Sequence, residues 1–288
     1  MPDRLAVLLQ YLLPKRALTV FGGFVAGARG GAATTWLIGW FIKRYGVNMA
    51  EAAQPDIRSY PTFNEFFTRA LKPDARPLAK ADLICPVDGA ISQFGAIRAG
   101  QIFQAKGHDY SAEALLGGDS QLAARFAEGS FATLYLSPRD YHRIHMPCDG
   151  RLVSMTHVPG ALFSVNPQTA RGVPGLFARN ERVVCVFEPL EGSSGRPFVL
   201  VLVGATIVGS MATAWHGIVN PPRVQEIRTW RYEDRQLILR QGEEMGRFLL
   251  GSTVVLLFPE GAFTFNPDWE AARAVRLGEP MGQHPAPP

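Results

Sequence analysis

Two histidines and one serine carry the clearest chemical potential in the sequence. His142 and His145 lie three residues apart, and imidazole is the natural general acid and base near neutral pH. Ser252 follows Gly251 and precedes an apolar, β-branched run, so its hydroxyl is expected on a stiff, partly buried element. A serine nucleophile needs a base, and the base needs a carboxylate that fixes its tautomer. Asp88, His145 and Ser252 therefore form a candidate triad by residue type.

The glycine before Ser252 makes an attack from within the chain sterically possible. Gly251 has no Cβ to obstruct its own carbonyl, and it tolerates backbone angles that few other residues adopt. Taken alone, Gly251-Ser252-Thr253 is weak evidence, because Gly-Ser begins many strands. The order Asp, His, Ser is also that of a subtilisin-like peptidase, but the sequence shows no convincing signal peptide and lacks the loop and helix expected around such a nucleophile.

No metal centre is expected. A His-x-x-His pair can bind a metal ion, but no third ligand follows at a typical spacing, and Pro147 breaks any helix that would align the two rings. Two histidines hydrogen-bonded in a loop are the plainer interpretation. Cys85, Cys148 and Cys185 are an odd number of widely spaced thiols, which indicates neither a disulfide framework nor a zinc site and fits a reducing compartment.

Residues 1 to 48 combine basic and apolar side chains. They hold six Lys or Arg against one acidic residue, and apolar side chains recur at helical spacing in two stretches, Leu5, Leu8, Leu9 and Leu12, then Trp36, Leu37, Trp40 and Phe41. The longest uncharged runs here are 12 and 13 residues, and a bilayer span needs roughly 18. We predict amphipathic helices on an anionic membrane surface, with Trp36, Trp40 and Phe41 facing the acyl chains. An ordinary core-facing helical pair is the alternative, and Pro14-Lys15-Arg16 disfavours a secretory signal.

The overall composition agrees with a membrane-surface protein. The net charge of +4 is a mild excess, and nucleic-acid readers cluster their basic residues, so no nucleic-acid partner is expected. With 47% hydrophobic and 19% charged residues, the chain can bury a substantial core, and disorder over most of its length is excluded.

The rest of the chain has the pattern of a β-rich domain. Short β-branched or aromatic runs punctuated by glycine predict strands at 131–136, 151–158, 183–187, 198–208 and 253–258. Helices are expected around 112–128 and in the last thirty or so residues. The proline-rich segment 49–80 is interpreted as a connector with a short helix. This leaves residues 1–48 as amphipathic helices and 81–288 as a catalytic domain.

Two Pro-x-Asp-Gly segments repeat 61 residues apart, at Pro86 to Gly89 and at Pro147 to Gly150. Asp-Gly suits a tight hairpin turn, because glycine is free to take positive φ. Similar turns occur in lipoyl and biotin carrier domains, but neither turn here presents the lysine that such a carrier modifies. The sequence thus predicts an α+β fold, in which a mainly antiparallel β body with two related β-modules follows the amphipathic helices.

Several motifs together resemble one known family. They are Tyr45-Gly-Val-Asn-Met49 with Ala50-Glu51-Ala52, Phe63-Asn64-Glu65-Phe66-Phe67, Pro86-Val87-Asp88-Gly89, Tyr141-His142-Arg143-Ile144-His145-Met146-Pro147, Phe163-Ser164-Val165-Asn166-Pro167 and Leu250-Gly251-Ser252-Thr253-Val254. Most of the chain resembles phosphatidylserine decarboxylases of the bacterial, membrane-associated type. The resemblance implies that the proenzyme cuts itself between Gly251 and Ser252 into a β chain, residues 1–251, and an α chain, residues 252–288.

The same resemblance implies roles for particular residues. Asp88 would orient His145, His145 would take the proton of Ser252, and Ser252 would end as a covalent pyruvoyl group. That group would form a Schiff base with phosphatidylserine and release CO2 and phosphatidylethanolamine without pyridoxal phosphate. His142 is the candidate proton donor to Cα.

Further implications concern the substrate site and the location of the enzyme. Tyr135, Phe163, Ser164 and Val165 are the candidate head-group residues. The protein would be peripheral on the cytoplasmic face of the cell membrane, and a homodimer is expected. A pyruvoyl enzyme for a soluble amino acid and a noncatalytic scaffold remain as alternatives, and only the scaffold predicts an intact chain of 31.5 kDa.

Overall fold

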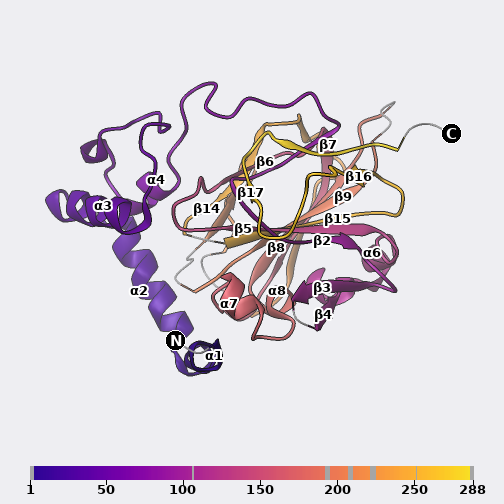
Figure 1. Cartoon of the computed structure of the whole chain (residues 1–288), viewed down its shortest axis with the longest axis horizontal. Coiled ribbons are helices and arrows are strands. Elements are labelled where there is room, and N and C mark those ends of the chain that lie inside the picture. Colours follow the sequence, from indigo (N-terminus) through magenta and orange to yellow (C-terminus); the bar gives the residue numbers. More distant parts are fainter. Residues whose placement is uncertain are drawn as a thin grey trace.

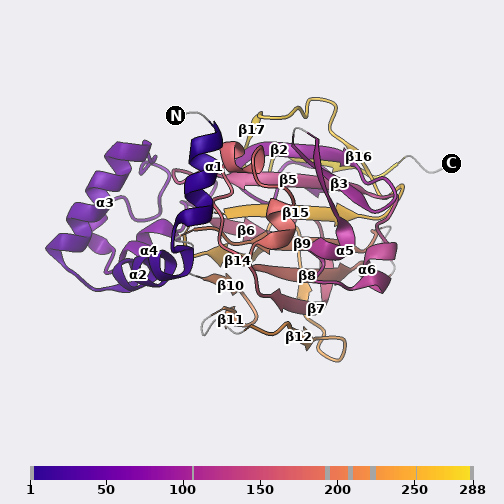
Figure 2. The ribbon, with the colours of Figure 1, turned by 90° about the horizontal axis from the view of Figure 1, so that it is seen from below.

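Three helices form the N-terminal part of the chain in the computed structural model, which describes residues 3–105, 107–191, 195–206, 210–220, 225–250 and 252–285. They are α1 (Asp3–Leu12), α2 (Lys15–Gly27) and α3 (Ala32–Tyr45). Pro14 separates the first two, and Gly46 ends α3 with a φ of 69°. The pattern predicted α1 and α3 but not α2. In Figures 1 and 2 the indigo α2 and α3 lie beside the β body, and no described helix is long and apolar enough to cross a membrane.

A short aromatic segment joins these helices to the β body. The 3-10 helix η1 (Ile57–Ser59) precedes α4 (Phe63–Phe67), whose first turn is capped because the Thr62 hydroxyl accepts a hydrogen bond from the Glu65 N–H. Phe41 of α3 packs edge-on against Phe63, with the ring centroids 5.0 Å apart. The prediction that Phe41 faces lipid is therefore wrong, because its ring packs against a cluster of buried side chains that includes Phe63, Phe66 and Phe67.

The exposed aromatic residues of α3 lie elsewhere on the helix. Trp36 and Trp40 are 71% and 48% exposed. Both side chains are therefore exposed, as a side of α3 that faces lipid requires.

One sheet of nine antiparallel strands forms the body. Its order is β12-β7-β8-β9-β15-β5-β2-β17, and β13 also pairs with β7. The strands are β2 (Gly89–Ala96), β5 (Ser130–Leu136), β7 (Gly150–Val158), β8 (Arg182–Glu188), β9 (Phe198–Val203), β12 (Arg228–Arg231), β13 (Ile238–Leu239), β15 (Ser252–Phe258) and β17 (Ala274–Val275). The five strands predicted from apolar runs are found as β5, β7, β8, β9 and β15, although β9 ends at Val203, short of the predicted 208.

The central strands are covered on both faces. Successive side chains of β9 alternate between two hydrophobic clusters, with Leu200 and Leu202 in one and Val199, Val201 and Val203 in the other. Burial on both faces explains why such strands are apolar throughout instead of alternating with polar residues.

Smaller elements complete the body. A four-stranded sheet contains β11 (Gly217–Ile218), β10 (Met211–Thr213), β14 (Glu244–Phe248) and β6 (Arg143–His145), a three-stranded sheet contains β1 (Leu83–Ile84), β18 (Pro280–Gln283) and β16 (Thr264–Phe265), and β3 (Gln101–Ala105) pairs with β4 (His108–Ser111). The remaining helices are short: α5 (Ala112–Leu115), α6 (Ser120–Ala124), α7 (Pro167–Ala170) and α8 (Leu176–Arg179).

Two helix predictions need correction. The helix expected around 112–128 is split into α5 and α6, because Gly117 and Gly118 take φ values of 81° and 89° between them. The helix expected in the last thirty residues is wrong, since the described part of that segment, 259–285, contributes β16, β17 and β18. Prolines and glycines interrupt this segment too often for a helix.

The repeated Asp-Gly segments lead into strands, but their glycines do not have the positive φ that was predicted for hairpin turns. Neither Gly89 nor Gly150 has a positive φ. Gly89 is needed for space, because an added Cβ would lie 2.3 Å from the backbone oxygen of Tyr135. A Cβ on Gly150 would lie 3.2 Å from the ring of Phe198, a tight contact that requires only a small shift of that ring. The two strands that follow, β2 and β7, belong to one sheet with four strands between them.

Candidate active site

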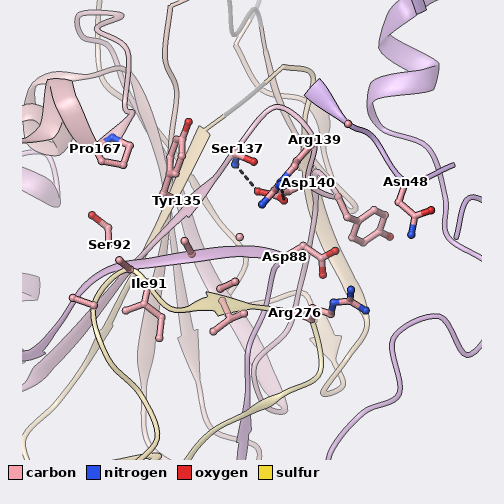
Figure 3. Close-up of a pocket in the computed structure, with 18 of the residues that line it drawn as sticks. Asn48, Asp88, Ile91, Ser92, Tyr135, Ser137, Arg139, Asp140, Pro167 and Arg276 are labelled. Carbon is pink, nitrogen blue, oxygen red and sulfur yellow. Dashed lines mark hydrogen bonds and ion pairs between the residues drawn. The ribbon is translucent and has the colours of Figure 1, made fainter. Parts of the chain in front are cut away.

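A cavity of about 760 Å³ lies where the N-terminal part meets one end of the large sheet (Figure 3). Its walls come from residues 46–76 of the connector region, the start of β2, the end of β5 with the following loop, residues 167–171 and residues 271–276. Asp88 and Tyr135 both line it.

Backbone register brings several predicted residues to that end of the sheet. Tyr135 pairs with Ala90 on one side and with Thr253 on the other, and Ser252 pairs with Leu136. The backbone N–H of His145 donates to the carbonyl of Pro86 over 2.9 Å. Segments distant in sequence therefore converge around the first residue of β15.

The description of the predicted cleavage site is partial. Gly251 lies outside the described residues, and Ser252 is described by its backbone alone. The pairing of β15 with β5 locates the backbone of Ser252 beside Leu136. The cleavage of the Gly251-Ser252 bond stays a prediction.

His145 is held as a neutral base. Its Nδ1 lies 2.7 Å from the carbonyl oxygen of Gly242, and a carbonyl only accepts, so Nδ1 carries the proton and Nε2 the lone pair. Burial lowers the pKa of His145. The hydroxyl of Tyr141 lies 3.2 Å from Nε2, and because burial raises the pKa of Tyr141 to about 12, this hydroxyl is the donor.

Asp88 is engaged by other groups. Its carboxylate accepts from Arg76 Nε over 2.8 Å and Nη2 over 2.5 Å, and from the backbone N–H of Leu277 over 2.9 Å. The Arg76 Nη2 group also binds Glu51, at 2.7 Å, and the hydrogen bond to Asp88 is the main cause that raises the pKa of Arg76. The prediction that Asp88 fixes the tautomer of His145 is not met by a hydrogen bond in this structure, where the Gly242 carbonyl occupies that position.

His142 is enclosed. Its Nδ1 lies 2.8 Å from the Asp140 carbonyl oxygen, and its ring packs against Phe67 with the centroids 4.1 Å apart. Burial lowers the pKa of His142 to about 3, so the ring is neutral at pH 7. The Nε2 atom has no partner among the described residues and carries a lone pair. The predicted role as a proton donor therefore requires that His142 first receive a proton.

The candidate substrate residues separate into two places. Tyr135 lines the cavity, whereas Phe163, Ser164 and Val165 lie outside its lining. The Phe163 ring packs against Tyr11 of α1 with the centroids 5.1 Å apart, and the Ser164 N–H donates to a side chain of the same helix. The residues that follow in sequence, at 167–171, do reach the cavity.

Sequence reasoning missed several charged residues of the cavity. Arg69, Arg76 and Asp140 line it. Asp140 accepts a hydrogen bond from the Ser137 N–H over 2.7 Å (Figure 3), and burial raises its pKa. One signal was present: Arg69 lies two residues after Phe66-Phe67, and a charged side chain is unusual in a segment that its aromatic residues would bury.

The described residues contain no group of three His, Cys, Asp or Glu side chains placed to hold a metal ion. The three cysteines are free thiols, and burial raises the pKa of both Cys85 and Cys148 to about 12.

Comparison with known proteins gives a consistent result. A family model described as phosphatidylserine decarboxylase matches residues 63–283, and a second model, described as PSD, matches residues 5–46. A phosphatidylserine decarboxylase proenzyme of Variovorax paradoxus is 73% identical over 281 residues, covering 98% of each chain. Proenzymes of the same name from Methylibium petroleiphilum and Dechloromonas aromatica are 72% and 68% identical, with 99% of each chain covered.

Proposed function

The chain belongs to the phosphatidylserine decarboxylase family of proenzymes, and we propose that Ser252 is the serine from which it makes its pyruvoyl group. As a member of that family it is a carboxy-lyase that forms phosphatidylethanolamine and carries a pyruvoyl group made from its own chain. The observation that carries the assignment to Ser252 is the register of β15, which begins with this residue beside Leu136 and Tyr135 at the cavity end of the sheet.

His145 is the proposed base for self-cleavage. Its Nε2 lone pair, once the Tyr141 hydroxyl turns away from it, takes the hydroxyl proton of Ser252, and the freed oxygen attacks the carbonyl carbon of Gly251. The C–N bond breaks as an ester forms, and the proton passes to the nitrogen of Ser252. Elimination then releases the carboxylate of Gly251, and hydrolysis of the resulting dehydroalanine releases ammonia and leaves the pyruvoyl end. Support comes from the tautomer imposed by Gly242, which leaves Nε2 unprotonated.

Asp88 acts in this proposal through its charge. Its negative charge is among the causes that raise the pKa of His145, so it stabilises the imidazolium that forms when the serine loses its proton. Arg76 holds the carboxylate in place. Direct orientation of the ring by Asp88 would require a rearrangement that frees Nδ1 from Gly242.

The surroundings of Ser252 suit the group that it is proposed to become. The pyruvoyl carbonyl supplies an electron sink for the pair left when CO2 departs. Tyr135 and Tyr141 wall the cavity and are largely buried, and burial raises the pKa of both phenols. They therefore keep their protons, and they restrict the access of water to the reacting atoms.

An anionic lipid surface is the proposed partner of α1, α2 and α3. Ten of the fifteen exposed large hydrophobic side chains in the described residues lie between positions 8 and 40: Leu8, Tyr11, Leu12, Leu13, Val20, Phe21, Phe24, Val25, Trp36 and Trp40. Lys43 and Arg44 follow in the last turn of α3. Apolar side chains with basic neighbours suit attachment parallel to a membrane, and we propose a peripheral location on the cytoplasmic face.

Denaturing mass spectrometry of the purified protein tests the assignment. Two fragments that meet at residues 251 and 252, the smaller without a free N-terminal amine, are expected. Ser252→Ala should remain one chain and release no CO2, and a cut, active alanine variant would rule the proposal out. Comparing free serine with phosphatidylserine in detergent micelles tests the lipid preference: a preference for free serine would favour a soluble amino acid as substrate.

A further inference from the structure

Arg69 is a buried cation without a carboxylate partner. It is 4% exposed, and no ion pair within 4.0 Å joins it to an acid in the described part of the chain. Its Nε has no hydrogen-bond partner among the described residues. The one hydrogen bond found for its side chain is long, 3.4 Å from Nη2 to the carbonyl oxygen of Arg139.

Other arginines around the cavity are compensated differently. Arg76 lies between Asp88 and Glu51 at 2.5 and 2.7 Å. Arg276 is 62% exposed to water at its side chain and lies 3.6 Å from Glu51. Arg69 is buried and has no acid within 4.0 Å among the described residues, and burying a charge without such a partner is expensive.

Arg69 is one of the residues that line the wall of the cavity. That wall contains five arginines against three carboxylates, an excess of two positive charges. An anion that entered the cavity would therefore meet a positive wall, in which Arg69 has no acid within 4.0 Å among the described residues. Planar guanidinium groups bind phosphate oxygens through paired, charge-assisted hydrogen bonds.

Building on the proposed function, we propose that Arg69 is a substrate-binding residue that holds the phosphodiester of phosphatidylserine. The head group offers two anions, the phosphodiester and the carboxylate that leaves as CO2. A cation on the carboxylate would stabilise the charged ground state and lose its partner during decarboxylation, which opposes catalysis. A cation on the phosphodiester keeps its partner from substrate to product. Arg69 therefore anchors the head group and leaves the carboxylate to a less polar environment.

The contrasting explanation is a purely structural role. The guanidinium lies 5.5 Å from the centroid of the Phe66 ring and touches the loop that carries His142 through the Arg139 carbonyl. A structural residue would affect every substrate and inhibitor equally, whereas an anchor for the phosphodiester affects only ligands that contain one.

Three soluble ligands separate these roles in the processed enzyme. Dihexanoyl phosphatidylserine carries both anions, dihexanoyl phosphatidylethanolamine carries only the phosphodiester, and O-octylserine carries only the carboxylate. For Arg69→Gln we expect the KM of the first and the inhibition constant of the second to rise together, by about 10- to 100-fold. The kcat/KM for O-octylserine should change less than about threefold. Arg69→Lys should recover part of the loss for the other two ligands, because lysine keeps the positive charge but lacks the paired N–H donors of the guanidinium.

The matched control is Arg58→Gln, which removes an exposed arginine that pairs with Asp56 outside the cavity. It should change none of the three constants. An unchanged inhibition constant for dihexanoyl phosphatidylethanolamine in Arg69→Gln would overturn the inference, and so would equal losses for all three ligands. A loss confined to the two carboxylate-containing ligands would assign Arg69 to the carboxylate instead.

A second measurement covers the case in which Arg69→Gln does not process. Calorimetric binding of dihexanoyl phosphatidylethanolamine to Ser252→Ala, with and without Arg69→Gln, should show the same 10- to 100-fold weakening, and equal affinities would overturn the inference. Failure of the proposed function would give a different result, because the wild-type chain itself would then stay uncut or release no CO2.

Discussion

The Nδ1 atom of His145 donates its proton to the carbonyl oxygen of Gly242 across 2.7 Å. This bond leaves Nε2 as the only basic atom of the ring, and it is made by backbone that no side-chain substitution at position 242 removes directly. The tautomer of His145 thus depends on the loop before β14 as well as on the histidine.

The pH dependence of self-cleavage should follow His145. Only the neutral ring can accept a proton, and burial lowers its pKa below the ordinary value of about 6.5. The first-order rate of cleavage should therefore change little between pH 8 and pH 7 and fall to half of its plateau only below pH 6.5, when the ring becomes protonated. Timed gels of freshly synthesised proenzyme across this range measure it.

Two variants test the assignment of that profile. His145→Ala should abolish cleavage at every pH. Tyr141→Phe removes the hydroxyl at 3.2 Å from Nε2 and should change the cleavage rate by less than about tenfold, because only one neutral hydrogen bond is lost and the Nε2 lone pair is freed. A wild-type rate that already declines between pH 8 and pH 7 would assign the base to another group.

Arg76 should contribute strongly to stability. Its side chain and that of Asp88 are 8% and 9% exposed, and their atoms approach to 2.5 Å. Replacing Arg76 with Gln leaves a buried carboxylate without its cation and should cost about 3–5 kcal/mol of unfolding free energy. Urea unfolding in the uncut Ser252→Ala background measures this, with Arg58→Gln as the exposed control, which should leave the midpoint unchanged.

Asp88→Asn should slow self-cleavage for a related reason. The variant removes the negative charge near His145 and one partner of Arg76, so the imidazolium forms less readily. Cleavage should slow by at least about tenfold, whereas Asp88→Glu should retain part of it. Cleavage of Asp88→Asn at the wild-type rate would remove Asp88 from the mechanism.

Gly89→Ala should disrupt the end of the sheet at the cavity. The added Cβ would lie 2.3 Å from the backbone oxygen of Tyr135, a contact that cannot relax by turning a side chain. A loss of about 1–3 kcal/mol or more is expected. Thermal unfolding in the Ser252→Ala background is the measurement, and Gly23→Ala in α2, with nothing within 4 Å of the new Cβ, should be neutral or stabilising.

Membrane attachment should depend on the exposed aromatic side chains of α2 and α3. Phe21, Phe24 and Trp36 are 68%, 76% and 71% exposed, so a triple substitution to Ser removes apolar surface without opening a core. Sedimentation with anionic vesicles should weaken by at least about tenfold. Phe103→Ser, at a 42% exposed side chain of β3, is the control, and equal binding by both variants would contradict the proposed surface.

Strands were predictable where both of their faces are buried. The run at 198–203 is apolar at every position and can be little else than a central strand, and β15 follows the same rule. The end of the chain was misjudged because its strands have two to four residues, too few to show a period. β18 pairs with β1 and β16, and β17 pairs with β2, and a local pattern does not contain these pairings.

The residue types of the candidate site were predictable, but the hydrogen-bond partners of those residues were not. Aspartate, histidine and serine suggested a triad, yet the choice between Gly242 and Asp88 as the partner of His145 depends on how the loop before β14 folds. Arg76 was interpreted as part of a connector, although it neutralises Asp88 twelve residues later. Long-range backbone contacts decide such pairings, and no sequence spacing encodes them.

The position of β15 has a consequence for the life of the folded protein. This strand pairs with β5 over seven residues and with β9 over five, so a break before Ser252 separates the chain at the middle of the sheet and not at its edge. Before the break, folding is a unimolecular search. Afterwards two polypeptides would have to find each other, and the short one would lack β5 and β9, the strands that pair with β15. A cut molecule that unfolds would therefore have no easy return, and its persistence would depend on the height of the unfolding barrier instead of on an equilibrium.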